Sequence, residues 1–251
     1  MILLYVLVFV AIGNWLAAAR TTDWDEPLWV DVYPVNADGS ANTQAYIDEL
    51  SPKDFEQIEA FFTREAARYE VAIERPFRLE LGPQIPNDIP KLPETQSILG
   101  TILWSLRMRW FALGIDPGEG RPRPDIKLFA LYYDESDATI LDRSTALERG
   151  LIAIAKLFAG RASSGPNQIV MAHELLHTLG ASDKYDLATN LPIYPHGFAQ
   201  PDRRPRYPQR DAELMAGRIP IDGQHAEMPA GLGRAVVGSA TALEIGWIAP
   251  H

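Results

Sequence analysis

The chain has 251 residues, a formal net charge of −10 at pH 7 and no cysteine. This length suits one well-cored domain, and 47% hydrophobic with 22% charged residues is ordinary for a globular protein. The acidic balance argues against a nucleic-acid partner, because phosphate binding needs a basic surface. The lack of cysteine excludes disulfides, thiolate metal ligands and cysteine nucleophiles.

The first nineteen residues, Met1–Ala19, are almost wholly apolar and stand directly before Arg20. Ala17-Ala18-Ala19 fits the small-residue cleavage site of a secretory signal. No Lys or Arg precedes the apolar run, however, and the run is long enough to span a bilayer, so we favour an uncleaved membrane anchor. In either case the rest of the chain is expected outside the cytoplasm. It would face the periplasm or cell exterior from its anchor, or be secreted if the segment is cleaved.

Periodicity predicts strands and helices in the first half of the chain. Apolar and polar residues alternate in part over 29–35 and strictly over 77–81, which predicts two strands. Ser51-Pro52 indicates a helix start, with a cap followed by proline in the first turn. A second helix is expected over 95–113, and we interpret it as a core helix with two solvated arginines rather than a membrane-surface helix.

The second half begins with two apolar runs of strand length, at 126–133 and 151–159. The loop 134–142 between them carries four acidic residues, and we expect a solvated turn there rather than a calcium site. A helix follows over 165–179. The long segment after it has few regular signals, and such a connection is usually functional or disordered. Residues 238–247 predict a closing helix.

The most informative run is His173-Glu174-Leu175-Leu176-His177, within the helix expected over 165–179. Residues four apart lie on one face of a helix, so the two imidazoles can bind one metal ion. Glu174 lies too far round to be a third ligand but can reach a water on the metal, as a general base would. Gly180 permits a left-handed turn that ends the helix, and the reversal would bring Asp183 back as a third, oxygen ligand. The run predicts a catalytic zinc site with an open fourth position.

The residues around this run favour a metal site over an amphipathic helix with two chance histidines. Gly165-Pro166 is a helix start of the expected kind. Apolar residues bury most of the helix: Ile169, Val170, Ala172, Leu175, Leu176 and Leu179. A charged Glu174 between histidines in such a helix needs compensation, which a metal ion supplies.

The extended run His173-Glu174-x-x-His177-x-x-Gly180-x-x-Asp183 resembles the zinc motif of the metzincin clan of metalloendopeptidases. It is most similar to the variants, such as snapalysin and the immune inhibitor A peptidases, in which aspartate stands for a third histidine. Residues 212–217 resemble the clan's Met-turn, a tight turn that places a methionine, here Met215, under the metal. Some metzincins have a tyrosine two residues later that assists the transition state. Gly217 stands there in this chain, so that role is unfilled or moved.

The resemblance implies an α+β fold of the zincin type, with a twisted mixed sheet backed by helices and an active-site helix. With the anchor or signal segment at 1–19, it makes 20–251 the catalytic domain. Within that domain, 20–180 would form the N-terminal subdomain and 181–251 a small C-terminal subdomain with the Met-turn. If the strand at 126–133 is the sheet edge over the cleft, it would pair with an extended peptide substrate.

Other residues are weaker candidates for the site. Asp186 is a rival third ligand three residues beyond Asp183, and Glu213 is the ligand that a gluzincin-type site would use. The remaining candidates are His196 and His225 as ligands or substrate contacts, Tyr185, Tyr194 and Tyr207 as oxyanion partners, and Arg203, Arg204 and Arg206 as partners of a substrate carboxylate.

We therefore expect a zinc metalloendopeptidase that acts on a peptide or protein outside the cytoplasm. Zn²⁺ held by His173, His177 and Asp183 would activate a water molecule, and Glu174 would pass its proton to the leaving amine. One alternative is a membrane-anchored binding protein that keeps a zincin fold without turnover, although a merely structural metal site would not need Glu174. Another is a zinc amidase acting on cell-wall peptides, which the sequence does not distinguish from a peptidase.

Overall fold

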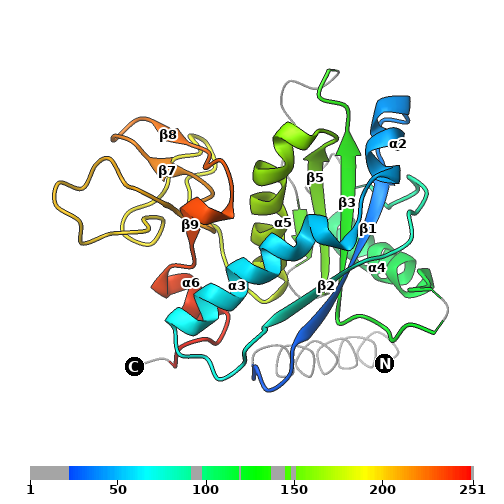
Figure 1. Cartoon of the computed structure of the whole chain (residues 1–251), viewed down its shortest axis with the longest axis horizontal. Helices are drawn as coiled ribbons and strands as arrows, with labels where there is room; N and C mark the ends of the chain where they lie inside the picture. The colour runs from blue at the N-terminus through cyan, green and yellow to red at the C-terminus, as the bar shows by residue number, and fades with distance from the viewer. Residues whose placement is uncertain (1–22, 92–97, 119, 137–144, 148–150, 250–251) are drawn as a thin grey trace.

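The computed structural model describes residues 23–91, 98–118, 120–136, 145–147 and 151–249. At its centre lies a five-stranded sheet in the order β2-β1-β3-β5-β4 (Figure 1). Four strands are parallel: β1 (Leu28–Asn36), β2 (Phe77–Leu81), β3 (Ile126–Tyr133) and β5 (Ile152–Phe158). The short edge strand β4 (Thr145–Leu147) runs antiparallel to β5. The chain therefore forms a mixed sheet backed by helices, as the sequence predicts.

Alternate residues of the central strands point into two separate apolar layers. Val32 and Leu128 belong to the layer covered by α3 (Glu56–Arg68) and α5 (Ser164–Thr178). Their neighbours Tyr33 and Phe129 belong to the layer covered by α4 (Ile98–Gly114), on the opposite face (Figure 1). This period of two, with both faces buried, explains why β1, β3 and β5 read as nearly continuous apolar runs.

Helix α5 begins within a residue of its predicted start, after a 3₁₀ turn at Arg161–Ser163. The side chain of Asn167 joins its first turns to the end of β5. Its Oδ1 accepts from the Phe158 N–H at 3.1 Å, and its Nδ2 donates to the Phe158 carbonyl at 2.8 Å. Apolar residues of the helix, including Ala172, Leu175 and Leu176, are buried against the sheet. The hydrogen bonds of Asn167 therefore hold the start of α5 at the end of β5, and apolar packing holds one side of the helix against the sheet.

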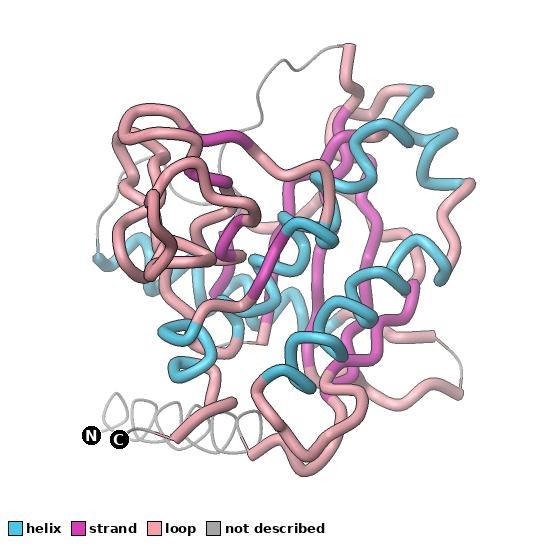
Figure 2. Tube along the Cα trace, turned by 60° about the vertical axis from the view of Figure 1, so that its left-hand side comes forward, coloured by secondary structure: helices cyan, strands magenta, loops and turns pink. Residues whose placement is uncertain are grey.

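The chain after α5 has little regular structure and gathers at one side of that helix (Figure 2). Its regular pieces are β6 (Ala212–Glu213) paired with β9 (Ala235–Val236), β7 (Ile219–Pro220) paired with β8 (Ala226–Glu227), a 3₁₀ turn (Leu232–Arg234) and α6 (Ser239–Glu244). Polar contacts tie this part to α3. Glu65 accepts from the Val237 N–H at 2.9 Å, and the Tyr69 hydroxyl donates to the Val237 carbonyl at 2.7 Å.

Most predicted elements are present within a few residues of their expected bounds, and the strands at 77–81 and 126–133 match in full. The sequence misses α2 (Ala41–Asp48), which Ser40 caps through its bond to the Thr43 N–H. That helix is mostly polar, so it has no apolar stripe to reveal it. The three residues of β4 are too few for a period-two signal.

Two interpretations are wrong. The strand at 126–133 is not a sheet edge, because β3 pairs with β1 on one side and β5 on the other. The helix over 95–113 is not a core helix with only its arginines solvated. One side of α4 is buried through Trp104 and Met108, but its other side exposes large apolar residues such as Trp110.

Two further predictions concern segments beyond the described residues. The anchor or signal segment, Met1–Ala19, lies entirely outside them. Across the part of the chain that the structure describes, no helix combines the length and apolar character needed to cross a bilayer. Of the acidic loop 134–142, only the first three residues are described. There the carboxylate of Asp134 accepts from the Ser136 N–H at 2.9 Å and from Asn42 Nδ2 at 2.7 Å.

Asn167→Ala tests the attachment of α5 to β5. The substitution would leave the Phe158 N–H and carbonyl without their partner, so we expect about 1–3 kcal/mol of lost stability. Thermal unfolding of the metal-free protein measures this loss. Gln57→Ala, on the exposed side of α3, is the control and should leave the unfolding temperature nearly unchanged. Equal unfolding temperatures for the two variants would contradict the proposed role of Asn167.

Candidate metal centre

His173 and His177 lie one turn apart on α5 and face the same side. Their ring centroids are 4.6 Å apart and their planes are nearly perpendicular, at 84°. Both side chains are only partly exposed, at 12% and 14%. The spacing that the sequence predicts therefore places two imidazoles side by side at the surface of an otherwise buried helix.

Asp183 meets both histidines. Its Oδ1 lies 3.2 Å from His173 Nε2 and 3.1 Å from His177 Nε2. The chain reverses between the helix and this residue at Gly180, whose φ of +96° suits glycine rather than residues with a side chain. The Gly180 N–H donates to the His177 carbonyl and the Ala181 N–H to the Leu176 carbonyl, which ends the helix. The predicted turn is present, and it returns Asp183 to the histidines.

Two backbone carbonyls orient the imidazole rings. His173 Nδ1 lies 3.0 Å from the Leu214 carbonyl, and His177 Nδ1 lies 2.7 Å from the Ala181 carbonyl. A carbonyl oxygen only accepts hydrogen bonds, so each Nδ1 carries a proton. Each neutral ring then has its lone pair on Nε2, directed at the point that Asp183 also faces. One ligand atom from each of the three residues lies within 4.8 Å of the others, which fits a single metal ion.

The protonation of Asp183 suits a ligand. Burial alone would raise its pKa, but hydrogen bonds and charge from His173 and His177 hold the pKa of this carboxyl well below its usual range. The carboxylate is therefore the stable form. Burial would lower the pKa of His173, but its hydrogen bond with Asp183 and the nearby charge of Glu174 raise it above the ordinary value. A proton and a metal ion compete for the same Nε2, so acid pH should weaken metal binding.

Glu174 is buried beside this cluster with a carboxylate oxygen that has no protein partner. Its residue is only 4% exposed, and Oε2 accepts no hydrogen bond within the described part of the chain. Burial raises the pKa of the carboxyl, while His173 and His177 act to lower it. A buried, unpaired carboxylate oxygen costs free energy unless a bound group completes it. The residues present therefore fit a metal site in which a water molecule lies next to Glu174.

An ion pair from outside the motif fixes the turn that carries Asp183. Lys184, which is buried, donates to both carboxylate oxygens of Glu244 in α6, at 2.8 and 2.7 Å. Glu244 also accepts from the Ser182 N–H at 3.0 Å and the Ser182 hydroxyl at 2.7 Å. The residues on both sides of Asp183 are thus bound to one carboxylate. Sequence reasoning missed Glu244, since nothing local marks a residue so far along the chain as a partner of this turn.

Met215 lies in a tight turn that contacts both the helix and the Asp183 segment. The residue is fully buried, and the turn closes through the Gly217 N–H, which donates to the Glu213 carbonyl at 2.9 Å. Leu214, just before Met215, supplies the carbonyl that orients His173. The Met215 carbonyl accepts from the Lys184 N–H at 3.0 Å. The predicted turn at residues 212–217 therefore exists, and it braces two of the candidate ligands.

The two rival ligands lie elsewhere. Asp186 is exposed, and its Oδ1 accepts from the Ala188 and Thr189 N–H groups in a local turn. Glu213 is fully buried, and its carboxylate accepts from three donors, the Ala216 and Gly238 N–H groups and the Thr241 hydroxyl. Neither belongs to the His173, His177 and Asp183 cluster.

The three candidate tyrosines are separated. The ring of Tyr185 lies 6.4 Å from that of His173, so it is beside the cluster. Tyr194 and Tyr207 instead pack against Phe198, at 5.4 and 5.7 Å between ring centroids. Among the described residues, Tyr185 is the one of the three whose ring packs against a candidate ligand.

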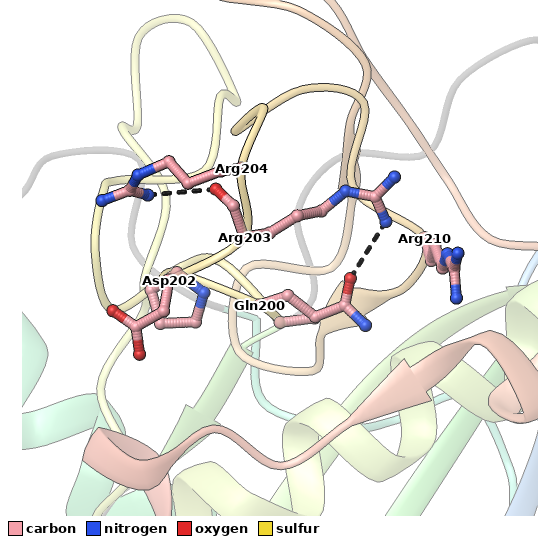
Figure 3. Close-up of a pocket in the computed structure, with 7 residues that line it drawn as sticks. Gln200, Asp202, Arg203, Arg204 and Arg210 are labelled. Atoms are coloured by element: carbon pink, nitrogen blue, oxygen red, sulfur yellow. Dashed lines mark hydrogen bonds between the residues drawn. The ribbon is translucent and has the colours of Figure 1, made fainter.

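The other polar candidates are also away from the metal cluster. His196 and His225 are exposed in loops. Arg203 and Arg204 line an open hollow with Gln200, Asp202 and Arg210, none of which is in the cluster (Figure 3). Arg203 donates to Gln200, whereas the guanidinium of Arg204 points the opposite way and donates to the Arg203 carbonyl (Figure 3). Arg206 stacks on Tyr194 at 3.8 Å from the ring centroid.

Comparison with known proteins does not assign the chain to a family. No protein-family model and no curated protein matches the chain.

Asp183→Ala tests the third ligand. Removing the carboxylate should lower zinc affinity by at least about tenfold, because each ligand fixes part of the coordination geometry. Zinc per chain, measured after dialysis against a weak chelator, reads this out. Asp186→Asn is the control and should keep the metal, since Asp186 bonds only within its own turn. Loss of zinc from Asp186→Asn but not from Asp183→Ala would reverse the assignment.

Glu244→Gln tests the ion pair behind the Asp183 turn. A neutral amide leaves the buried Lys184 charge without its partner, so the turn loosens and zinc affinity should fall by about tenfold although Glu244 binds no metal. Glu227→Gln, an exposed residue of the same part of the chain, is the matched control. Unchanged zinc affinity in Glu244→Gln would show that the turn does not need the pair.

The same variant makes a prediction about pH. Burial would raise the pKa of Glu244, but Lys184 and Ser182 hold it below the usual value. A carboxyl with a lowered folded pKa contributes stability above its unfolded pKa, and this contribution disappears as the pH falls through the folded value. The difference in unfolding temperature between parent and Glu244→Gln should therefore be present at neutral pH and vanish in acid.

Proposed function

We propose that this protein is a zinc-dependent metallopeptidase in which Glu174 is the general base. The observation that carries the proposal is the buried carboxylate of Glu174 next to the convergent His173, His177 and Asp183; one of its oxygens has no partner among the described residues. A structural metal site would have no use for a buried carboxylate that binds neither the metal nor the protein. A hydrolytic site needs such a group.

The donor set favours zinc over other common ions. Two imidazole nitrogens and one carboxylate are three protein ligands, the number typical of catalytic zinc with a further position for water or substrate. Calcium and magnesium prefer sites made of oxygen atoms. Structural zinc sites usually have four protein ligands. The resemblance of the run from His173 to Asp183 to the metzincin motif supports the same assignment.

The roles of the protein groups follow from their positions. A zinc ion bound here would act as a Lewis acid, lowering the pKa of a water molecule and polarising the scissile carbonyl. Glu174 would accept the proton of the attacking water and deliver it to the leaving nitrogen. Burial raises the pKa of this carboxyl in the metal-free protein, in the direction that favours holding a proton. The carbonyls of Leu214 and Ala181 hold the histidines in the tautomer that this chemistry needs.

We propose that an extended substrate pairs with β4 rather than with β3. The interior position of β3 leaves it no free backbone edge. Strand β4 pairs with β5 on one side, borders α5, and has no strand partner on its other side within the described residues. Backbone addition at such an edge provides affinity without regard to sequence.

Tyr185 is our candidate for the transition-state role that Gly217 leaves unfilled. Its ring lies beside His173 and comes from the same turn as Asp183. A phenol hydroxyl can donate to a developing oxyanion.

The site argues against one of the two alternatives but does not distinguish the other. A binding protein without turnover would not need Glu174, whose burial costs stability. Hydrolysis of a cell-wall amide would use the same residues, so substrate tests must include peptidoglycan fragments. Action outside the cytoplasm, with Met1–Ala19 as anchor or signal, remains part of the proposal and rests on the sequence alone.

Glu174→Gln tests the function. The variant should keep zinc near one ion per chain and lose turnover by about two to four orders of magnitude, because the amide cannot accept the proton. Cleavage of a peptide library and zinc analysis of parent and variant measure the two effects. Full activity in Glu174→Gln, or loss of its zinc, would contradict the role of Glu174 as base. Tyr185→Phe is a useful comparison, since it should lower turnover without changing zinc content.

The metal-free form gives a second, independent readout of Glu174. A carboxyl whose folded pKa is raised destabilises the fold as the pH rises above its unfolded value, and this cost is absent below both values. Metal-free Glu174→Gln should therefore unfold at a higher temperature than the parent near neutral pH. The gain should shrink as the pH falls below the ordinary range of glutamate.

A further inference from the structure

Helix α4 exposes a row of large apolar side chains to solvent. Trp110 is 82% exposed and Leu99 is 74% exposed, although both stand within a regular helix. The row consists of Leu99, Ile102, Leu103, Leu106, Trp110 and Leu113. An exposed row of this size marks an interaction surface, because single exposed apolar residues are ordinary but a contiguous set is not.

The row forms one stripe along the helix. At about 100° per residue, its six members fall within an arc of about 100°. Trp104, Met108 and Ala112 point the opposite way and are buried against the sheet. The helix is therefore apolar on two opposite sides, one against the sheet and one facing outward.

Two arginines border the outward stripe, one on each side. The same helical geometry places Arg107 about 90° to one side of the stripe's centre and Arg109 about 70° to the other. No aspartate or glutamate occurs in Ile98–Gly114, although the whole chain has a net charge of −10. An apolar stripe with aromatic and leucine residues and arginine borders is typical of helices that lie in the surface layer of a bilayer.

Helix α3, on the other face of the sheet, shows what an ordinary solvated helix of this protein looks like. Its buried side carries Ile58, Phe61 and Phe62. Its exposed side carries Glu56, Gln57, Ala60, Arg64, Ala67 and Arg68. The outward side of α4 carries large apolar residues instead. The comparison with α3 shows that a helix covering this sheet does not need an apolar outer side.

The described chain begins near the C-terminal half of α4. Asp23, the first described residue, lines a hollow together with Arg123 and Asp125. Arg123 and Asp125 also line a hollow with Arg109 and Leu113 of α4. Asp23 stands four residues after Ala19, a separation that an extended chain covers in at most about 15 Å. A membrane that held Met1–Ala19 would therefore lie close to this end of α4.

We propose that the outward face of α4 lies on a lipid bilayer, with the six apolar residues in the boundary between headgroups and acyl chains. The exposed Arg107 would reach the phosphates of anionic lipids beside the stripe. The face would act with the N-terminal segment as a second point of attachment. Because α4 and α5 cover opposite faces of the sheet, the candidate metal centre would face away from the bilayer (Figure 1). This inference does not depend on the proposed catalytic function.

Site-directed spin labelling tests the proposal on the full chain. The protein has no cysteine, so one introduced cysteine carries the only label. Leu103→Cys, Leu106→Cys and Trp110→Cys place labels on the stripe, and Ala60→Cys places a matched control on the exposed side of α3. Each labelled variant is reconstituted in vesicles of phosphatidylcholine and phosphatidylglycerol. Thermal unfolding first checks that each label leaves the fold intact.

The measured quantity is access of each label to oxygen, which concentrates in the bilayer, and to a paramagnetic complex that is soluble only in water. We expect the three stripe labels to lose most of their access to the water-soluble complex and to keep access to oxygen. The Ala60 label should remain open to the complex. Stripe labels that stay open to the complex would overturn the proposal.

Burial of the stripe under protein would also overturn the proposal, and it would change the access of the labels in a different way. Labels packed under the N-terminal segment or under a second copy of the chain would lose access to both reagents. Spin–spin broadening that disappears on dilution with unlabelled protein would identify the second copy. Its absence would identify the chain's own segment as the cover.

Discussion

The candidate centre depends on the convergence of three side chains from a helix and from the turn that follows it. The helical repeat sets the positions of the two imidazoles on α5. The geometry of the centre therefore depends on where the chain after Gly180 places Asp183. Asp183 lies about equally far from both Nε2 atoms, at 3.2 and 3.1 Å. Glu174 is buried next to this point, and one oxygen of its carboxylate, which has no partner in the described part of the chain, would be unfavourable without a bound group. The rest of the C-terminal part serves to hold that geometry.

Polar contacts add to apolar packing in holding the C-terminal part, whose described residues after α5 form only short strands and short helices. Glu244 binds the residues on both sides of Asp183, and the Met215 turn binds His173 through Leu214 and Lys184 through its own carbonyl. Buried Glu213 connects that turn to α6 through Thr241 and Gly238. Lys184, Glu213 and Thr241 are buried, where an unpaired partner costs more than a lost surface contact, whereas Glu244 itself lies at the surface. The site is therefore sensitive to substitutions that never touch the metal ligands.

The sheet separates two surfaces with different chemistry. One face is covered by α5 and α3 and carries the candidate centre, with the edge strand β4 beside α5. The other is covered by α4, which is apolar toward the sheet and apolar toward the outside. A bilayer against α4 would leave the centre and the edge of β4 open to substrates away from the membrane. The proposed attachment would therefore not compete with the proposed substrate for the same surface.

The sequence alone was sufficient for everything set by local periodicity. The helix with His173 and His177, its end at Gly180, and the strands at 77–81 and 126–133 are all present as predicted, since helical and strand repeats determine which residues share a face. The reversal that returns Asp183 was also predicted, because glycine marks the left-handed residue that a short reversal needs.

The tertiary structure determined what depends on distant partners. Sequence could not show that Asp186 and Glu213 bond elsewhere, that Glu244 pairs with Lys184, or that β3 lies inside the sheet. The sequence also led to the wrong environment for α4. An apolar residue that packs on the sheet and an apolar residue that is exposed look identical in the sequence. Periodicity records which residues share a face of an element. Whether that face is buried, and which polar groups its residues bond, depends on packing between segments far apart in the chain.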